Sequence, residues 1–91
     1  MKDLITRNYA SILKRGYITD KTTDLEFIHK IEEEVEEVIY ESLLNRKGKD
    51  NNLGEELADV ILTCLNYAYH FSIDIEKELH KKIDKNEKRK D

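Results

Sequence analysis

Two pairs of acidic residues in this sequence could hold a divalent cation. Glu34 and Glu37 lie in the acidic stretch IEEEVEEVIYE, and Glu56 and Asp59 lie further along the chain in EELAD. The members of each pair are three residues apart, so each pair projects from one face of a helix. Ligand sets made only of oxygen suit Mg²⁺ or Mn²⁺, and Mg²⁺ bound by a few carboxylates keeps positions open for phosphate oxygens. If the two helices face each other, we expect a Mg²⁺ site suited to phosphoryl chemistry.

The first acidic stretch has an alternative interpretation as a solvated helix surface. Glutamates at helical spacing repel one another by about 0.2 to 0.5 kcal/mol for each pair. Lys30 is the one base near enough to relieve this repulsion, at Glu33 and Glu34, and Glu41 lies on the same face with no assigned role. An acidic run on one helix is by itself typical of a solvated surface, so the second pair decides between the two interpretations.

The second pair belongs to a polar strip on an otherwise apolar segment. The strip consists of Glu56, Asp59, Thr63, Asn66 and His70. A helix that is apolar nearly all round is buried, so we expect this strip to face the inside of a bundle or a cleft. Buried carboxylates are costly unless they are paired or bind a metal. No lysine or arginine lies between Lys49 and Lys77, so a salt bridge within this helix is excluded and metal binding is favoured.

The elements that must position these residues are all helical. The chain has no proline and three glycines, a composition that favours long helices. Periodicity and capping signals predict four helices. The first spans about residues 3–14, and the second runs from a capping box at Thr23–Glu26 to about residue 46. The third spans about residues 52–70, and the fourth begins at about residue 72 or 74 and continues through IEKELHKKIDKNEKR. Short connections favour an antiparallel arrangement, so we expect an all-α four-helix bundle in a single domain of residues 1–91.

The composition also indicates self-association and a cytoplasmic protein. With 38% hydrophobic and 40% charged residues, one chain has little apolar material, so we expect a homodimer or homotetramer to complete the core. The basic tail, Lys77–Asp91, lacks interleaved aromatics and the net charge is −4, so we do not expect nucleic-acid binding. One cysteine, Cys64, excludes an internal disulfide. No signal peptide is apparent and no apolar run approaches the roughly 20 residues of a membrane span.

Three motifs in order resemble the signature of the MazG-like nucleoside triphosphate pyrophosphohydrolases. EEVEE (Glu33–Glu37) and EELAD (Glu55–Asp59) match the EExxE…ExxD pattern, and KIDKNEKR matches the K-x-x-x-N-x-x-R element of that family. The resemblance covers roughly residues 28–89. It implies a four-helix MazG-like bundle within the all-α NTP pyrophosphatase superfamily, beside the dimeric dUTPases and phosphoribosyl-ATP pyrophosphatase.

The resemblance also implies roles for individual residues. The metal ligands would be Glu34, Glu37, Glu56 and Asp59. Glu34 and Glu37 would be catalytic together with Glu33, which could orient or deprotonate the attacking water. On the last helix, the residues that grip phosphate oxygens would be Lys82, Asn86 and Arg89. These three project within about 60° of one another, a geometry that a solvated basic face would share.

The activity implied by the resemblance is Mg²⁺-dependent cleavage of a nucleoside triphosphate, ribo or deoxy, into the monophosphate and pyrophosphate. House-cleaning of non-standard or excess nucleotides would be its purpose. A phosphoribosyl-ATP pyrophosphatase, a non-catalytic helical module that dimerises and binds a partner, and a cation sensor are the alternatives. Members of the family commonly stack an aromatic residue on the base, and the candidates, each of which could instead be a core residue, are Tyr9, Tyr17, Phe27 and Tyr67.

Overall fold

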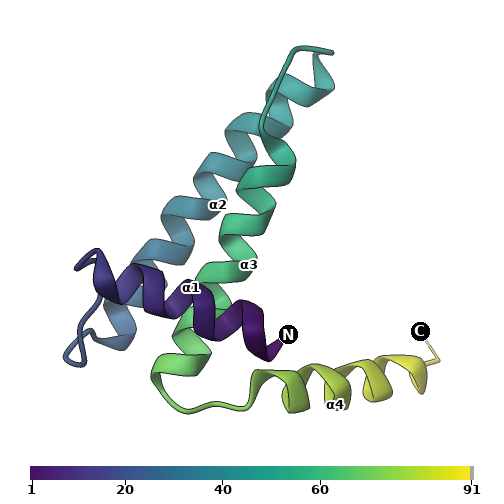
Figure 1. The fold of residues 1–91 in the computed structure, drawn as a ribbon. Helices are drawn as coiled ribbons and strands as arrows, with labels where there is room; N and C mark the ends of the chain where they lie inside the picture. The colour runs from purple at the N-terminus through teal and green to yellow at the C-terminus, as the bar shows by residue number, and fades with distance from the viewer. Residues whose placement is uncertain (91) are drawn as a thin grey trace.

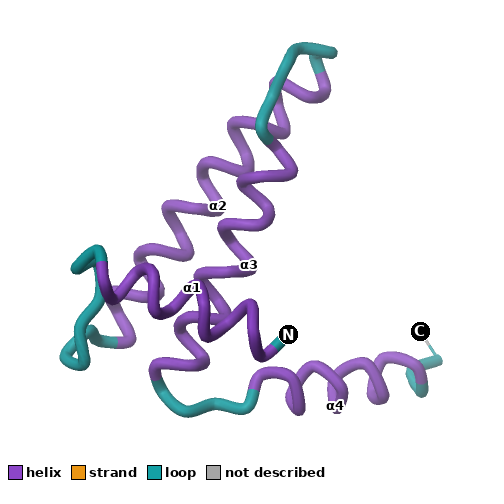
Figure 2. Tube along the Cα trace, in the orientation of Figure 1, coloured by secondary structure: helices purple, strands orange, loops and turns teal. Residues whose placement is uncertain are grey.

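The computed structural model describes residues 1–90 and contains four helices joined by short connections (Figure 1). The helices are α1 (Lys2–Lys14), α2 (Asp24–Arg46), α3 (Leu53–His70) and α4 (Ile75–Glu87). Within these 90 residues no strand is present (Figure 2). The predicted all-α fold is therefore confirmed, and the helices begin and end close to the positions that capping and periodicity predict.

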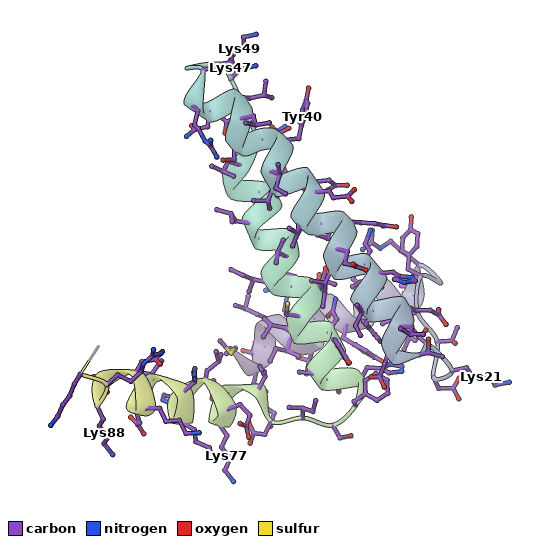
Figure 3. All side chains as sticks on the ribbon, turned by 180° about the vertical axis from the view of Figure 1, so that it is seen from behind. Lys21, Tyr40, Lys47, Lys49, Lys77 and Lys88 are labelled. Atoms are coloured by element: carbon purple, nitrogen blue, oxygen red, sulfur yellow. The ribbon has the colours of Figure 1, made fainter. Side chains whose placement is uncertain are left out.

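The long helices α2 and α3 form an antiparallel hairpin that is the scaffold of the molecule. They lie side by side along most of their length, and α1 packs across the end of the hairpin against α3 (Figure 1). Helix α4 turns away from the hairpin after the α3–α4 connection and touches α3 alone among the other three helices. The side chains of Lys77 on α4 and of Lys88, directly after its end, consequently point away from the rest of the chain (Figure 3).

Two different devices start the helices of the hairpin. At α2 the predicted capping box is present, because the Glu26 N–H donates to Thr23 Oγ1 at 3.3 Å and the Thr23 N–H donates to Glu26 Oε1 at 3.4 Å. At α3 the Asn52 side chain makes no capping bond. Instead the Asn52 N–H donates to Glu41 Oε1 at 2.7 Å, so a glutamate of α2 holds the beginning of α3. This bond ties the start of α3 to α2, close to the acidic pair that follows.

The core is small and lies where α1, the start of α2 and the end of α3 meet. Its buried apolar side chains are Ile5, Ile18, Phe27, Leu65 and Ala68. The ring of Phe27 stacks on that of Tyr67, with 5.3 Å between centroids, and the His70 ring lies 5.0 Å from Phe27. These aromatic contacts join the beginning of α2 to the end of α3, and they hold the hairpin closed at the end opposite the Glu41–Asn52 bond.

Much of the apolar surface of the hairpin is exposed in the single chain. On α2 the exposed apolar side chains are Leu25, Ile28, Val35, Ile39 and Leu43. On α3, Leu57 and Ile61 are about half exposed and Cys64 is exposed as well. The expectation that α3 is buried on all sides therefore does not hold for one chain by itself. None of the helices described here combines the length and the apolar character that crossing a membrane requires.

Candidate metal centre

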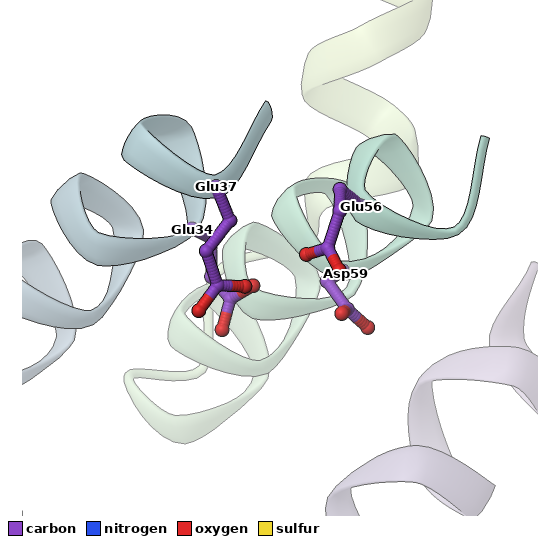
Figure 4. Close-up of side chains that lie close together, drawn as sticks. All are labelled: Glu34, Glu37, Glu56 and Asp59. Atoms are coloured by element: carbon purple, nitrogen blue, oxygen red, sulfur yellow. The ribbon is translucent and has the colours of Figure 1, made fainter. Parts of the chain in front are cut away.

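Four carboxylates from the two long helices meet at one point on the hairpin (Figure 4). Glu34 and Glu37 come from α2, and Glu56 and Asp59 come from α3. Each contributes one oxygen, and these four oxygens all lie within 4.8 Å of one another. The sequence predicts this convergence, because the residues of each pair share a face of their helix and the two helices pack face to face. The assignment of the four residues as metal ligands stays a prediction.

The burial of the four residues is uneven. Glu34 is the most buried, with 6% of its surface exposed, while Glu56 and Asp59 are half-buried and Glu37 is exposed. With all four groups ionised, Glu34 Oε2 and Glu56 Oε2 are buried without a hydrogen-bond partner among residues 1–90. A buried carboxylate oxygen with no donor is costly. A hard divalent cation would supply the missing partner, so the donor set and its burial both fit Mg²⁺ or Mn²⁺.

The repulsion among the four carboxylates is reflected in the raised pKa of Glu56. A hydrogen bond with Glu37, burial, and the negative charges of Glu37, Asp59 and Glu34 raise the pKa of Glu56 to about 7. The physical reason is that four carboxylates so close together cannot all stay ionised at little cost, so one of them retains a proton that it shares with a neighbour. A divalent cation in the cluster would take over the role of that proton.

Lys30 is the cation closest to the cluster. Its Nζ lies 3.0 Å from Glu34 Oε1 and 3.6 Å from Glu33 Oε2, as the i,i+4 and i,i+3 spacing predicts. The hydrogen bond to Glu34 is the largest cause that raises the pKa of Lys30. Glu33 is exposed, and the structure groups it with Lys30 rather than with the four converging carboxylates. Its predicted role as an auxiliary to the attacking water stays untested.

The predicted phosphate-binding residues of the last helix do not meet the carboxylates within one chain. They are Lys82, Asn86 and Arg89, and all three are exposed. Lys82 and Asn86 belong to α4, and Arg89 follows its end. Because α4 leads away from the hairpin, the structure places this set apart from the acidic cluster (Figure 1). The sequence motif identifies a common face of α4 but carries no information about the direction in which α4 leaves α3.

A pocket of about 530 Å³ lies directly beside the cluster. Glu34 and Asp59 line one part of it, and the rest is formed by α1, the α1–α2 connection, the first turns of α2 and the middle of α3. The predicted polar strip of α3 does face inward, since Thr63 and Asn66 are buried at 9% and 3% exposure. Sequence reasoning identified Thr63 and Asn66 through this strip, but it missed Asn8 on α1, which lines the same pocket.

His70, the last member of the strip, has a structural role. Its Nδ1 lies 2.8 Å from the Tyr9 hydroxyl, and its Nε2 lies 3.0 Å from the Thr22 carbonyl oxygen. Because the carbonyl can only accept, Nε2 carries the proton, and Nδ1 accepts a hydrogen bond from Tyr9. Both ring nitrogens of His70 are thus engaged, and the ring ties α1 and the α1–α2 connection to α3. His70 is therefore a brace of the pocket wall and has no nitrogen free for a ligand.

The fold and the cluster together define a helical hairpin in which two acidic pairs, one from α2 and one from α3, face each other. The family model of the MazG nucleotide pyrophosphohydrolase domain matches residues 22–91, and the chain belongs to the MazG family. The match spans both acidic pairs and the basic motif of the last helix. No curated protein sequence and no solved structure matches the chain.

Proposed function

We propose that the protein is a Mg²⁺-dependent nucleoside triphosphate pyrophosphohydrolase that converts a ribo- or deoxyribonucleoside triphosphate and water into the monophosphate and pyrophosphate. Membership of the MazG family supports the nucleotide chemistry. The observation that carries the metal dependence is the buried Glu34, whose Oε2 has no partner among residues 1–90 and which lies among three further carboxylates. Removal of damaged or surplus nucleotides is the purpose that this activity would serve.

The roles of the residues follow from their positions. Glu34, Glu37, Glu56 and Asp59 would hold the Mg²⁺. The bound ion would neutralise phosphate charge and make a coordinated water more acidic. Glu34 is the fixed ligand, because burial and Lys30 restrict its side chain, while the exposed Glu37 can adjust to substrate. Glu33, one turn from Glu37 and open to solvent, would take up the proton of the attacking water.

We further propose that a homodimer or homotetramer is the functional form of this single-domain protein. The exposed apolar stripes of α2 and α3 and the small core of one chain support association. Association would also give Lys82, Asn86 and Arg89 a way to reach a cluster, because α4 projects beyond its own hairpin. In that arrangement the cations of one chain would neutralise triphosphate oxygens bound at the carboxylates of another.

The reaction can be tested by incubating the protein with nucleoside triphosphates and Mg²⁺ and assaying pyrophosphate and orthophosphate separately. We expect pyrophosphate in amounts equal to the monophosphate, and none in the presence of EDTA. Orthophosphate as the sole product would contradict cleavage between the α and β phosphorus atoms. Glu37→Ala and Asp59→Ala should abolish turnover with unchanged helicity, whereas Glu32→Ala, at an exposed position of α2 outside the cluster, should retain it. Full activity of Glu37→Ala or Asp59→Ala would refute the ligand assignment.

A further inference from the structure

The pocket beside the acidic cluster contains a hydrogen-bonded pair of amide side chains that does not belong to the proposed metal site. Asn8 of α1 donates from Nδ2 to Oδ1 of Asn66 on α3 at 3.2 Å, across 58 residues of sequence. We propose that this amide pair reads the base of the nucleotide whose phosphates lie at the carboxylates. This inference rests on the proposed function, and it identifies the residues that set the base preference.

The position of the pair suits a nucleoside whose phosphates are at the cluster. The same pocket of about 530 Å³ is lined by Glu34 and Asp59 and by Asn8 and Asn66, so the metal ligands and the amides share one continuous space. Pockets that bind small molecules commonly enclose 300 to 1,000 Å³ and combine apolar walls with a few placed polar groups. The apolar walls here are supplied by Ile12, Ile18 and Leu62.

The chemistry of the pair is complementary to the edge of a base. The shared bond uses one hydrogen of Asn8 and one lone pair of Asn66, which leaves the Asn66 amide nitrogen and the Asn8 carbonyl oxygen without a partner among residues 1–90. Asn66 is 3% exposed, so these remaining groups can meet a ligand only from the pocket. A donor beside an acceptor is the pattern with which amide side chains bind the hydrogen-bonding edges of bases.

The aromatic residues that sequence analysis offered for base recognition are engaged elsewhere. Phe27 is 4% exposed and stacks on Tyr67, and Tyr9 bonds to His70. Tyr17 is 73% exposed, and the guanidinium of Arg15 lies 5.2 Å from its ring centroid, so these two side chains belong to the rim of the pocket. Phe27 and Thr63 also line the pocket, but one face of the Phe27 ring is covered by Tyr67 and the Thr63 hydroxyl donates to the Asp59 carbonyl oxygen. The amide pair offers both a donor and an acceptor, so base discrimination falls to it.

The test compares dCTP with dUTP as substrates of the protein of residues 1–91 with Mg²⁺. The two rings have the same size but differ in an amino group against a carbonyl. In N66D the carboxylate still accepts from Asn8 but presents oxygen in place of the amide hydrogens. In N8D the Asn66 amide must turn over to donate, so acceptors again face the pocket. Both variants should therefore favour the amino base, and we expect the ratio of kcat/KM for dCTP over dUTP to rise about 10-fold or more.

The chain offers a matched control for this experiment. Asn51, in the loop between α2 and α3, donates from Nδ2 to Oδ1 of Asn45 in the last turn of α2 at the same distance of 3.2 Å, and this exposed pair lies outside the pocket. N45D makes the same chemical change there and should leave the ratio within about twofold of the wild type. If the buried N66D does not fold, N8D carries the test, since Asn8 is only half-buried.

The outcomes separate this inference from the proposed function. A folded N8D variant that hydrolyses both nucleotides with the wild-type ratio would overturn the amide pair and leave the hydrolase intact. A wild-type protein that releases no pyrophosphate from any nucleotide would overturn the hydrolase. In that case calorimetric binding of deoxycytidine and deoxyuridine, without metal, tests the pocket alone. A shift toward deoxycytidine in N8D would support base reading, and an unchanged preference or no binding would overturn it.

Discussion

Replacing Glu34 by glutamine should change the stability of the protein in opposite directions with and without metal. In metal-free protein at pH 8, above the pKa of about 7 that its neighbours give Glu56, the Glu56 carboxyl is largely ionised and adds its charge to the cluster. Two unit charges 4.8 Å apart repel each other by about 0.9 kcal/mol even at the dielectric constant of water. Glu34 has three such neighbours, and it gains about 1.4 kcal/mol from Lys30 at 3.0 Å. Repulsion therefore exceeds attraction by about 1 kcal/mol.

Removing the charge of Glu34 should relieve this excess. We expect the metal-free Glu34→Gln variant to melt about 5 °C above the wild type, because 1 kcal/mol shifts the midpoint of a domain of this size by about 4 to 8 °C. In Mg²⁺ the order should reverse. At a concentration 100 times its dissociation constant, a ligand stabilises the folded state by about 2.7 kcal/mol, and the variant has lost the most buried ligand.

The assay is thermal unfolding followed by circular dichroism, at one protein concentration, in EDTA and in Mg²⁺. Glu32→Gln is the matched control, because Glu32 lies on the same helix, is exposed and stands outside the cluster. It should show the same gain from Mg²⁺ as the wild type. A Glu34→Gln variant that is less stable than the wild type in EDTA, or that gains as much from Mg²⁺, would refute the view that Glu34 is held in place for a cation.

Three further predictions concern the groups around the cluster. The pKa of Glu56 in the folded protein, about 7, is above its ordinary value of 4.5, so between these pH values the folded protein binds more protons than the unfolded chain. The stability of the metal-free protein should therefore fall as the pH rises from about 4.5 to 7. Glu56→Gln should reduce this pH dependence in melting curves recorded at pH 5, 6 and 8. Glu41→Ala removes the acceptor of the Asn52 N–H and should lower the free energy of unfolding by about 1 kcal/mol in urea titrations, whereas an effect no larger than that of Glu32→Ala would show that the bond does not hold α3. Tyr9→Phe removes the hydrogen bond to His70 and should cost about 0.5 to 1.5 kcal/mol in the same titrations; unchanged stability would contradict the role of His70 as a brace.

The helices and the acidic cluster could be predicted because their signals are local. A helix of known period fixes which residues share a face, so the pairing of Glu34 with Glu37 and of Glu56 with Asp59 needs only the spacing along the chain. The inward orientation of Asn66 could be predicted in the same way, because its helix is otherwise apolar. One assumption joins the pairs, namely that the two helices are antiparallel neighbours, and the short loop between them favours this strongly.

The role of Asn8 and the direction of α4 could not be predicted, because neither depends on a local signal in the sequence. Asn8 acquires its meaning from Asn66, 58 residues away, and nothing in the sequence of α1 distinguishes this asparagine from a solvated one. The direction of α4 depends on the connection at Ser72, which adopts a positive φ of 58° that its residue type does not announce. The capping of α3 by Glu41 was missed because the bond spans 11 residues between two helices, whereas capping rules describe contacts within one turn.

The acidic stretch of α2 is best understood as two roles on one helix face, the observed contact with the start of α3 and the proposed binding of a cation. Glu41 accepts a hydrogen bond from the start of α3, and this bond adds to the loop and to the packing of α2 against α3 in setting the register that brings Glu56 opposite α2. Glu34 lies two turns earlier on the same face of α2. There it meets the acidic pair of α3, Glu56 and Asp59. If the cluster binds a cation as proposed, the repulsion along α2 follows from using one helix face both to contact its neighbour and to share a cation with it. Neutralising Glu41 should therefore weaken Mg²⁺ binding at a cluster that it does not touch.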